Sequence, residues 1–434
     1  MSQTTFIAST PEFDTYRHAS KERLAGLVGS LVERARDIDP QLHILAGDID
    51  GSGIARQIEA LFERFPDPRL RPPLFGVPVG VKDIIRVDGA AIRCGSLLPP
   101  VLFKGEEARC VRMLRDAGAI IFVQTATTEF AYFEPAATKN PHNPRHTPGG
   151  SSCGSAAGVA AGLFPLALGT QTAGSVIRPA SFCGVVGMKP SFGAIPTEGI
   201  VHFSRSVDHV GFFCRSAADI GSVMAAFDPR WTDDGNVQRL RAGVPAGPFL
   251  EQVPAQVMDC FERALAVLEA GGVEIVRAPC LDDIEDIAER HRDLMAAEFA
   301  QEQEALYAEY GHLYRPGTAG IIERGKTIPP RRVEEARQSC ADLRGKLTEL
   351  MDAHDLDLWL CPSTLGEAPA GLRGTGSPAM NVPWTHAGLP AVSLPAGKGP
   401  AGLPLGLQCA GRFGADGRLA AAAQRLETLL RAMG

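Results

Sequence analysis

The stretch Gly149–Lys189 constrains this chain more than any other. It opens on the turn Gly149–Ser155, which reads GGSSCGS, and continues through a run rich in alanine and glycine. A second turn, Thr170–Ser175, reads TQTAGS. Glycine permits backbone angles that are closed to other residues and lets a ligand approach the main chain. Two such turns around a helix-like segment would place two serine hydroxyls and several N–H groups in one pocket, as acyl transfer requires.

The apolar pattern of the remaining chain predicts an α/β fold. Glu106–Ala117 has helical spacing, Gly118 fits a helix C-cap, and Ala119–Gln124 has the pattern of a buried strand. The same alternation recurs along the chain, as expected for helices that cover a mostly buried sheet. The chain has 434 residues, enough for roughly two or three ordinary domains or one large α/β domain. Because no clear linker is visible, we expect a single domain over residues 1–434.

The pattern divides this domain into four sections. N-terminal helices occupy about residues 1–70, and a core that carries both serine turns occupies about residues 74–215. Residues 281–355 are charged and helical, with a break at Ile328–Pro330. We interpret this section as a helical excursion from the core that is able to border a substrate pocket. Residues 356–434 return to the sheet and close with a helix.

Charge and composition narrow the classes of partner. Lys and Arg number 43 and Asp and Glu number 50, so a net charge of −7 gives no reason to expect nucleic acid or an anionic membrane. The apolar run Ala156–Leu168 is too short to span a bilayer, and Met1–Thr5 shows no secretory signal. Ten scattered cysteines without a Cys-x-x-Cys pair are typical of reduced thiols in a cytoplasmic protein. Since metal-ligand spacing and nucleotide-binding glycine motifs are absent from the sequence, we expect neither metal nor cofactor.

The two serine turns and an upstream lysine, Lys82 in the motif Gly80–Asp83 (GVKD), resemble the signature of the amidase signature family of serine hydrolases. The resemblance runs from about Leu74 to Val210 and again from Cys361 to Gly411. It implies one α/β domain around a large mixed sheet. It also implies hydrolysis of a carboxamide to an acid plus ammonia or an amine, through an acyl-enzyme and without a cofactor.

The resemblance assigns catalytic roles by position. Ser175 would be the acylated nucleophile, and Lys82 would be the base. Ser151 would be the bridging serine, reached through a cis peptide bond, and Ser152 would hold its turn by hydrogen bonds. The oxyanion hole would consist of the backbone N–H groups of Thr172, Ala173, Gly174 and Ser175.

The residues alone leave simpler interpretations open. Ser175 could bond its own backbone in a turn, and the serines of the first turn could cap the helix that follows. Lys82 could pair with Asp83 or Asp88 at a strand end. Burial without such a partner would instead lower the pKa of the lysine and leave a neutral amine as a base.

Two other nucleophile systems have to be considered. His209 follows Asp208 directly, so a Ser-His-Asp triad is one alternative. Cys153 lies among glycines and could act as a thiol nucleophile. The resemblance implies that His209 has a structural role. It also implies that Cys153 is a substitution at a position where the family usually has glycine.

Departures from the common family pattern bear on the substrate. Ala173 stands where many members have glycine, and Gln171 stands where many have aspartate. Arg178 follows the nucleophile by three positions where many members have arginine after two. The pattern of Gln171 and Arg178 is similar to the malonamidase-type branch, where this arginine implies a substrate carboxylate held by bidentate pairing. The alternative is that Arg178 ties down the loop.

We therefore expect a cytoplasmic amidase acting on a small carboxamide that can bear a carboxylate, and we leave a homodimer open. One alternative is the glutamine-hydrolysing subunit of a tRNA-dependent amidotransferase, which would need partner subunits. The short chain and the departures at Gln171 and Ala173 count against it. A non-catalytic scaffold is the other alternative, and the presence of Lys82, Ser151 and Ser175 counts against that.

Overall fold

The structure is a computed structural model that describes residues 5–232, 237 and 239–432. Residues 1–4, part of the segment where we expect no secretory signal, lie outside the described residues. The strands are Pro78–Lys82 (β1), Ile120–Thr125 (β2), Leu166–Gln171 (β3), Val186–Lys189 (β4), His209–Cys214 (β5), Leu240–Ala246 (β6), Val273–Pro279 (β7), Leu358–Pro362 (β8), Ala391–Lys398 (β9) and Pro404–Gly411 (β10).

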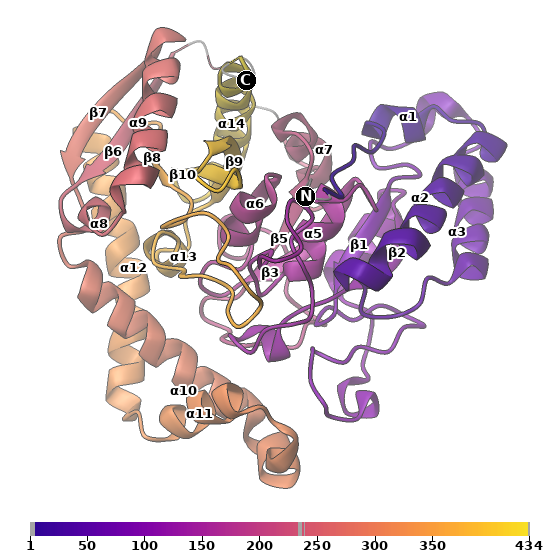
Figure 1. Cartoon of the computed structure of the whole chain (residues 1–434), viewed down its shortest axis with the longest axis horizontal. Helices are drawn as coiled ribbons and strands as arrows, with labels where there is room; N and C mark the ends of the chain where they lie inside the picture. Colours follow the sequence, from indigo (N-terminus) through magenta and orange to yellow (C-terminus); the bar gives the residue numbers. More distant parts are fainter. Residues whose placement is uncertain (1–4, 233–236, 238, 433–434) are drawn as a thin grey trace.

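Helices surround these strands (Figure 1). They are Phe13–Arg17 (α1), Lys21–Leu42 (α2), Gly51–Arg64 (α3), Arg109–Asp116 (α4), Cys153–Ala160 (α5), Ile177–Cys183 (α6), Ile220–Met224 (α7), Pro248–Glu251 (α8), Ala255–Ala270 (α9), Ile284–Tyr310 (α10), Pro316–Lys326 (α11), Pro330–Ala353 (α12), Val382–His386 (α13) and Asp416–Arg431 (α14).

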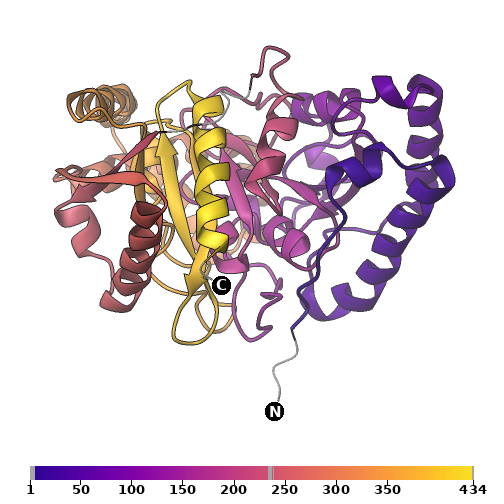
Figure 2. The ribbon, with the colours of Figure 1, turned by 90° about the horizontal axis from the view of Figure 1, so that it is seen from above.

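All the strands belong to one sheet, in the order β2-β1-β3-β5-β4-β9-β10-β8-β6-β7. The pairs β1–β2, β1–β3, β6–β7 and β6–β8 are parallel and the others are antiparallel. Every residue of β1, β3, β5 and β10 is buried, so both faces of the sheet are covered. Figure 2 shows α14 lying along β9 and β10 on one of these faces. The predicted single α/β domain with a mixed, mostly buried sheet is confirmed.

The predicted helix–glycine–strand unit after residue 106 is present with a later start. Helix α4 begins at Arg109 because Ala108, with ψ of 138°, has a non-helical backbone and is the N-cap. The N–H group of Ala108 donates to the carbonyl oxygen of Arg86. Ala117 is the C-cap, and Gly118 follows it with φ of 88°. Glycine is favoured in this left-handed region directly after a helix.

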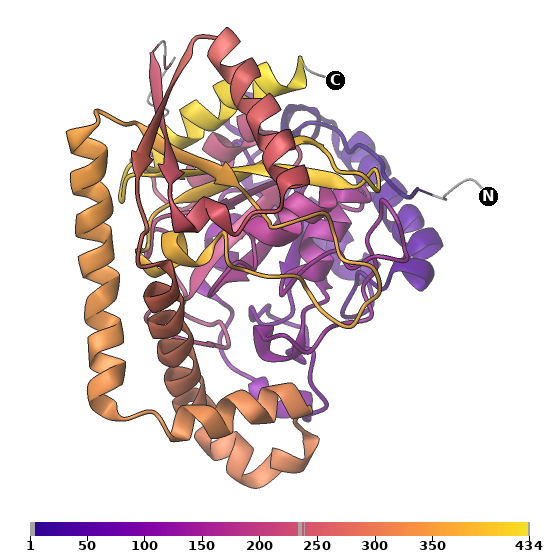
Figure 3. The same cartoon turned by 60° about the vertical axis from the view of Figure 1, so that its left-hand side comes forward.

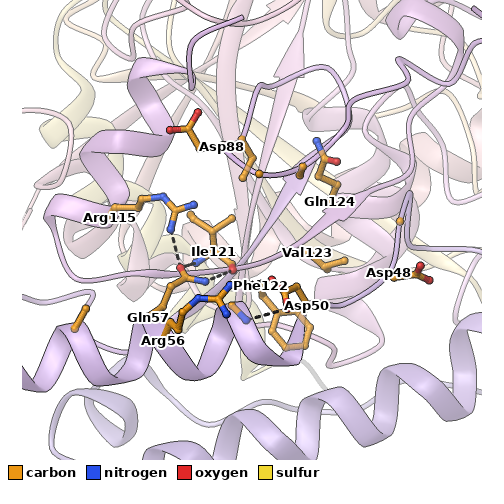
Figure 4. A pocket seen from close by; sticks show the side chains of 16 residues that line it. Asp48, Asp50, Arg56, Gln57, Asp88, Arg115, Ile121, Phe122, Val123 and Gln124 are labelled. Carbon is orange, nitrogen blue, oxygen red and sulfur yellow. Dashed lines mark hydrogen bonds and ion pairs between the residues drawn. The ribbon is translucent and has the colours of Figure 1, made fainter. Parts of the chain in front are cut away.

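The edge strand β2 is protected by a side chain of α3. Gln57 accepts a hydrogen bond from the Ile121 N–H group over 2.9 Å and donates one to the Ile121 carbonyl oxygen over 3.0 Å. Arg115 donates to the same glutamine over 2.8 Å (Figure 4). These groups line a cavity on the sheet edge whose lining contains none of the predicted catalytic residues. A capped edge is a poor template for pairing with another strand.

Helices α10, α11 and α12 extend away from the sheet, with α10 and α12 side by side (Figure 3). Helix α11 ends at Lys326 and α12 begins at Pro330, where the sequence predicts a break. Proline fits this first helical position because the N–H group it lacks would have no partner inside the helix. Among the described residues, no helix has both the length and the apolar character that crossing a membrane would require.

Candidate active site

The predicted catalytic residues lie at the carboxyl ends of two neighbouring parallel strands, β1 and β3. Lys82 is the last residue of β1, and Thr170 lies at the end of β3. The turn with Ser151 leads into α5, and the turn with Ser175 connects β3 to α6. In open α/β sheets this edge is where ligands usually bind. The two turns that were predicted to meet line one pocket, the first through Ser151 and the second through Thr172, Ala173 and Ser175.

Lys82 is fully buried, and its partners are hydroxyl groups. Its Nζ atom lies 2.7 Å from Ser151 Oγ and 2.7 Å from Thr170 Oγ1. Burial lowers the pKa of Lys82 to about 7. Among the described residues no carboxylate forms an ion pair with it; Asp83 instead accepts a hydrogen bond from the Arg93 N–H group over 2.9 Å. The geometry therefore favours a neutral amine over a structural ion pair.

The first serine turn contains a cis peptide bond between Gly150 and Ser151. Ser152 Oγ donates to the carbonyl oxygen of Thr170 over 3.1 Å, which ties the turn to the end of β3. Ser151 and Ser175 are both buried and both line one small pocket. The cavity volume of this pocket is about 20 Å³, which is room for about one water-sized group.

The second turn presents its backbone N–H groups to no protein acceptor within the described residues. This holds for the N–H groups of Thr172, Ala173, Gly174 and Ser175. The turn is held from its other side: Thr172 Oγ1 donates to Asp208 Oδ1 over 2.7 Å. Gln171 Oε1 accepts from the N–H groups of Val176 and Ile177 over 2.7 and 3.0 Å. Unpaired N–H groups beside a nucleophile have the chemistry of an oxyanion hole.

Arg178 also lines this pocket, and it is only 2% exposed. Its Nη2 atom donates to the Gly150 carbonyl oxygen over 2.6 Å and to Thr375 Oγ1 over 3.2 Å. Its Nε and Nη1 atoms are buried without a hydrogen-bond partner within the described residues, and no carboxylate pairs with it there. Burial lowers the pKa of Arg178 to about 9. The guanidinium can therefore accept an anionic partner from the pocket.

The two alternative nucleophile systems are not assembled around this pocket. His209 Nδ1 donates to the Val207 carbonyl oxygen over 2.7 Å, and neither serine bonds to this ring among the described residues. Asp208 accepts from Thr172, as described above. Cys153 Sγ points to the carbonyl oxygen of Ala126 at 3.3 Å, and burial raises the pKa of this thiol.

Several residues of the site were not found from the sequence. Thr170 accepts a hydrogen bond from Lys82, and its only signal was its place as the first residue of the TQTAGS motif. The aromatic residues Tyr132, Phe133 and Phe203 form part of the wall; aromatic side chains are common in cores, so no chemical pattern marked them. Met295 of α10 also lines the pocket.

The family profile described as Amidase matches residues 27–420. This chain belongs to the amidase family. The resemblance carried by the two serine turns and Lys82 is thereby confirmed, and so is the expectation of an enzyme that hydrolyses amide C–N bonds.

The proteins similar to this amidase-family chain include an amidotransferase subunit and two amidases. A glutamyl-tRNA(Gln) amidotransferase subunit of Neisseria meningitidis serogroup C is 30% identical over 411 residues, covering 82% of this chain and 84% of the relative. A solved amidase structure superposes with a TM-score of 0.86 at 31% identity, covering 96% of this chain and 97% of the other. Native peptide amidase from Stenotrophomonas maltophilia has a TM-score of 0.79 at 26% identity, covering 95% and 94%.

Proposed function

We propose that this enzyme hydrolyses a small carboxamide to an acid plus ammonia or an amine, with Ser175 as nucleophile and Ser151 and Lys82 as the proton path. The observation that carries the proposal is the fully buried Lys82 with its Nζ atom 2.7 Å from Ser151 Oγ, at the pocket that Ser175 also lines. A serine hydroxyl becomes a good nucleophile only when a base takes its proton. A lysine with a pKa near 7 is matched to that task at neutral pH.

The proton path follows from the hydroxyl partners of Lys82. In the neutral amine, one N–H group donates to Thr170, and the lone pair faces the hydroxyl of Ser151. Ser175 Oγ forms a bond to the substrate carbonyl carbon while its proton passes to Ser151 Oγ, and the Ser151 proton passes to Lys82. When the C–N bond breaks, Ser151 returns a proton to the leaving nitrogen and regains one from Lys82. Water then hydrolyses the acyl-enzyme by the reverse path, which releases the acid.

The negative charge that develops on the carbonyl oxygen would be bound by the second turn. Its candidate donors are the N–H groups of Thr172, Ala173, Gly174 and Ser175, which have no protein acceptor among the described residues. Removing one such donor typically costs about 3–4 kcal/mol of transition-state stabilisation.

The substrate class follows from Arg178. A buried cation without a counter-ion is costly, and a bound carboxylate would offset that cost. The Nε and Nη1 atoms have no partner among the described residues, and each can donate one charge-assisted hydrogen bond to a carboxylate oxygen. They do not form a parallel pair of donors, because both such pairs of a guanidinium include Nη2, which already donates to Gly150 and Thr375. The arginine and the nucleophile line the same small pocket, so the carboxylate would lie close to the scissile amide, as in the half-amide of a short dicarboxylic acid.

A panel of small amides tests the activity. Half-amides of short dicarboxylic acids, their diamides and simple monoamides are incubated with the wild-type enzyme and with Ser175→Ala, and released ammonia is measured. We expect release from the half-amides with the wild-type enzyme only. Equal release by Ser175→Ala, or none from any amide, would contradict the proposal.

The second candidate function is the glutamine-hydrolysing subunit of a tRNA-dependent amidotransferase. It is favoured by the Neisseria meningitidis relative, a glutamyl-tRNA(Gln) amidotransferase subunit at 30% identity, and the name of that relative stands against our expectation of no nucleic-acid partner. Ammonia release from glutamine that requires co-purifying chains or tRNA would support this function over the first.

We also propose a reducing compartment such as the cytoplasm. All ten cysteines are buried and unpaired, as in proteins whose thiols stay reduced. Fractionation of the source cells tests this location.

A further inference from the structure

The turn Thr172–Ser175 is held by its carbonyl oxygens, each through a donor from a different element. His291 Nε2 of α10 lies 2.9 Å from the carbonyl oxygen of Thr172. Thr385 Oγ1 of α13 donates to the carbonyl oxygen of Ala173 over 2.7 Å. The N–H group of Arg178 in α6 donates to the next carbonyl oxygen, that of Gly174, over 3.0 Å. Three consecutive peptide units are therefore fixed through their carbonyl oxygens.

Because each peptide unit is planar, a contact that fixes its carbonyl oxygen also fixes the direction of its N–H group. In a trans peptide the C=O and N–H bonds of one unit point in opposite directions. The only cis bond within the described residues is the one between Gly150 and Ser151, so the units of the second turn are trans. Holding the Thr172 oxygen therefore fixes the Ala173 N–H group, and holding the Ala173 oxygen fixes the Gly174 N–H group.

We propose that His291 and Thr385 are positioning residues, which aim two N–H groups of the turn Thr172–Ser175 at the oxyanion. The inference rests on the proposed function, since the turn serves as an oxyanion hole only if Ser175 is acylated. It also gives the helical excursion a role in the reaction, because His291 belongs to α10.

The hydrogen atoms of the histidine pair can be assigned from its partners. The carbonyl oxygen of Thr172 only accepts, so His291 Nε2 carries hydrogen. Burial lowers the pKa of His291 to about 3 and that of His386 to about 4, so both rings are neutral. His291 Nδ1 is then an acceptor, and His386 Nδ1, 3.1 Å away, is its donor.

This series of hydrogen bonds begins at Ser339 on α12. His386 Nε2 must accept, and the Ser339 hydroxyl lies 2.7 Å from it. The same hydroxyl lies 2.8 Å from the carbonyl oxygen of Ala336. A bond to the ring gives the buried nitrogen a closer and stronger donor than Cys340 Sγ, which lies 3.7 Å from it. Every donor thus points toward Thr172, from Ser339 of α12 through His386 of α13 and His291 of α10 to the turn. Networks with one consistent direction hold their members rigidly.

The Thr385 contact is determined in the same way. Gln171 Oε1 already accepts two N–H groups, so its Nε2 atom is the one that donates to Thr385 Oγ1, over 2.9 Å. The threonine hydroxyl accepts from Gln171 and is left to donate. Its acceptors are the carbonyl oxygens of Ala173, at 2.7 Å, and of Asn381, at 3.0 Å. The shorter contact is the one to the turn.

A fluorophosphonate probe tests the inference, because its phosphoryl oxygen takes the place of the oxyanion when Ser175 is labelled. Thr385→Val keeps the shape of the side chain and removes the donor, whereas Thr385→Ser keeps the donor. We expect Thr385→Val to slow labelling at least about tenfold, and Thr385→Ser to remain within about threefold of wild type. Thr348→Val on α12, whose hydroxyl bonds only within its own helix, is the matched control and should label like wild type.

Turnover of the best amide in the panel gives a second readout. The oxyanion forms only when Ser175 attacks the carbonyl carbon and is absent from the bound substrate, so Thr385→Val should lower kcat and leave KM nearly unchanged. If Thr385→Val does not fold, the pair His291→Leu and His291→Gln replaces it, since a glutamine amide can still donate to Thr172. Equal labelling rates for Thr385→Val, Thr385→Ser and wild type would overturn the inference while Ser175→Ala stays unlabelled. Labelling that survives in Ser175→Ala would instead contradict the proposed function, and the inference with it.

Discussion

Arg178 donates a hydrogen bond from Nη2 to the carbonyl oxygen of Gly150 over 2.6 Å, so the guanidinium beside the nucleophile also holds the peptide unit that leads into Ser151. The sequence left two roles open for this arginine, a loop anchor and a carboxylate ligand. One nitrogen serves the first role, and two nitrogens without a partner among the described residues are available for the second. The two roles are compatible, and an experiment has to separate them.

Ser175→Ala should abolish covalent labelling by a fluorophosphonate and lower amide hydrolysis at least about 10⁴-fold, because the attacking oxygen is removed. Labelled peptide mapped by mass spectrometry checks the site. Ser30→Ala, at an exposed serine of α2, is the control and should label normally. Undiminished labelling of Ser175→Ala would rule out this serine as the nucleophile.

Local patterns predicted much of the fold but only part of the site. The α4–β2 unit and the break before α12 follow from residues that are adjacent in the sequence. The contact of Lys82 with Ser151 joins residues 69 positions apart, and only the family resemblance predicted it. The contacts of His291 with Thr172 and of Thr385 with Ala173 span 119 and 212 positions. These contacts arise from the packing of whole helices against the turn. A single histidine or threonine in a helical sequence does not predict which distant carbonyl oxygen it will contact.

The pH dependence should follow Lys82. Its pKa is lowered to about 7, so the amine is protonated and inactive as a base below that pH, and neutral above it. We expect kcat/KM to fall as pH drops through about 7 and to reach a plateau above, measured as ammonia release across a buffer series. Activity that stays constant from about pH 5 to about pH 9 would contradict this role. These limits lie about two units below and above the pKa of Lys82.

Lys82→Ala should lower activity at least about a hundredfold, the lower range for loss of a general base. Lys326→Ala is the matched control, since Lys326 forms a surface ion pair with Glu323 at 2.9 Å. Such exposed pairs contribute little to stability, so this variant should keep full activity. A loss of less than about tenfold in Lys82→Ala would favour a structural role for the buried lysine.

Gly174 should tolerate no side chain. A Cβ atom there would lie 2.4 Å from Asn381 Oδ1, and the amide of Asn381 is fixed by bonds to Ser363 and Gln408. We expect Gly174→Ala to shift the turn and to lower kcat at least about tenfold. The control is Gly345→Ala in the middle of α12, where nothing lies within 4 Å. That change should raise the free energy of unfolding by about 0.5–1 kcal/mol, because alanine favours a helix. Thermal melting of both variants separates the two effects.

Arg178→Lys should separate loop anchoring from carboxylate binding. Lysine keeps the charge but lacks the separate planar donors of the guanidinium, so it cannot bond to Gly150 and also supply the donors at Nε and Nη1. The loss of the bond to Gly150 should slow hydrolysis of a half-amide and of its neutral diamide alike. The loss of carboxylate pairing should add a rise in KM for the half-amide alone. We therefore expect the ratio of kcat/KM, half-amide over diamide, to fall by about 10–100-fold, the range of one charge-assisted hydrogen bond. If both substrates slow equally and the ratio stays at its wild-type value, Arg178 is a loop anchor, and the substrate carries no carboxylate at this site.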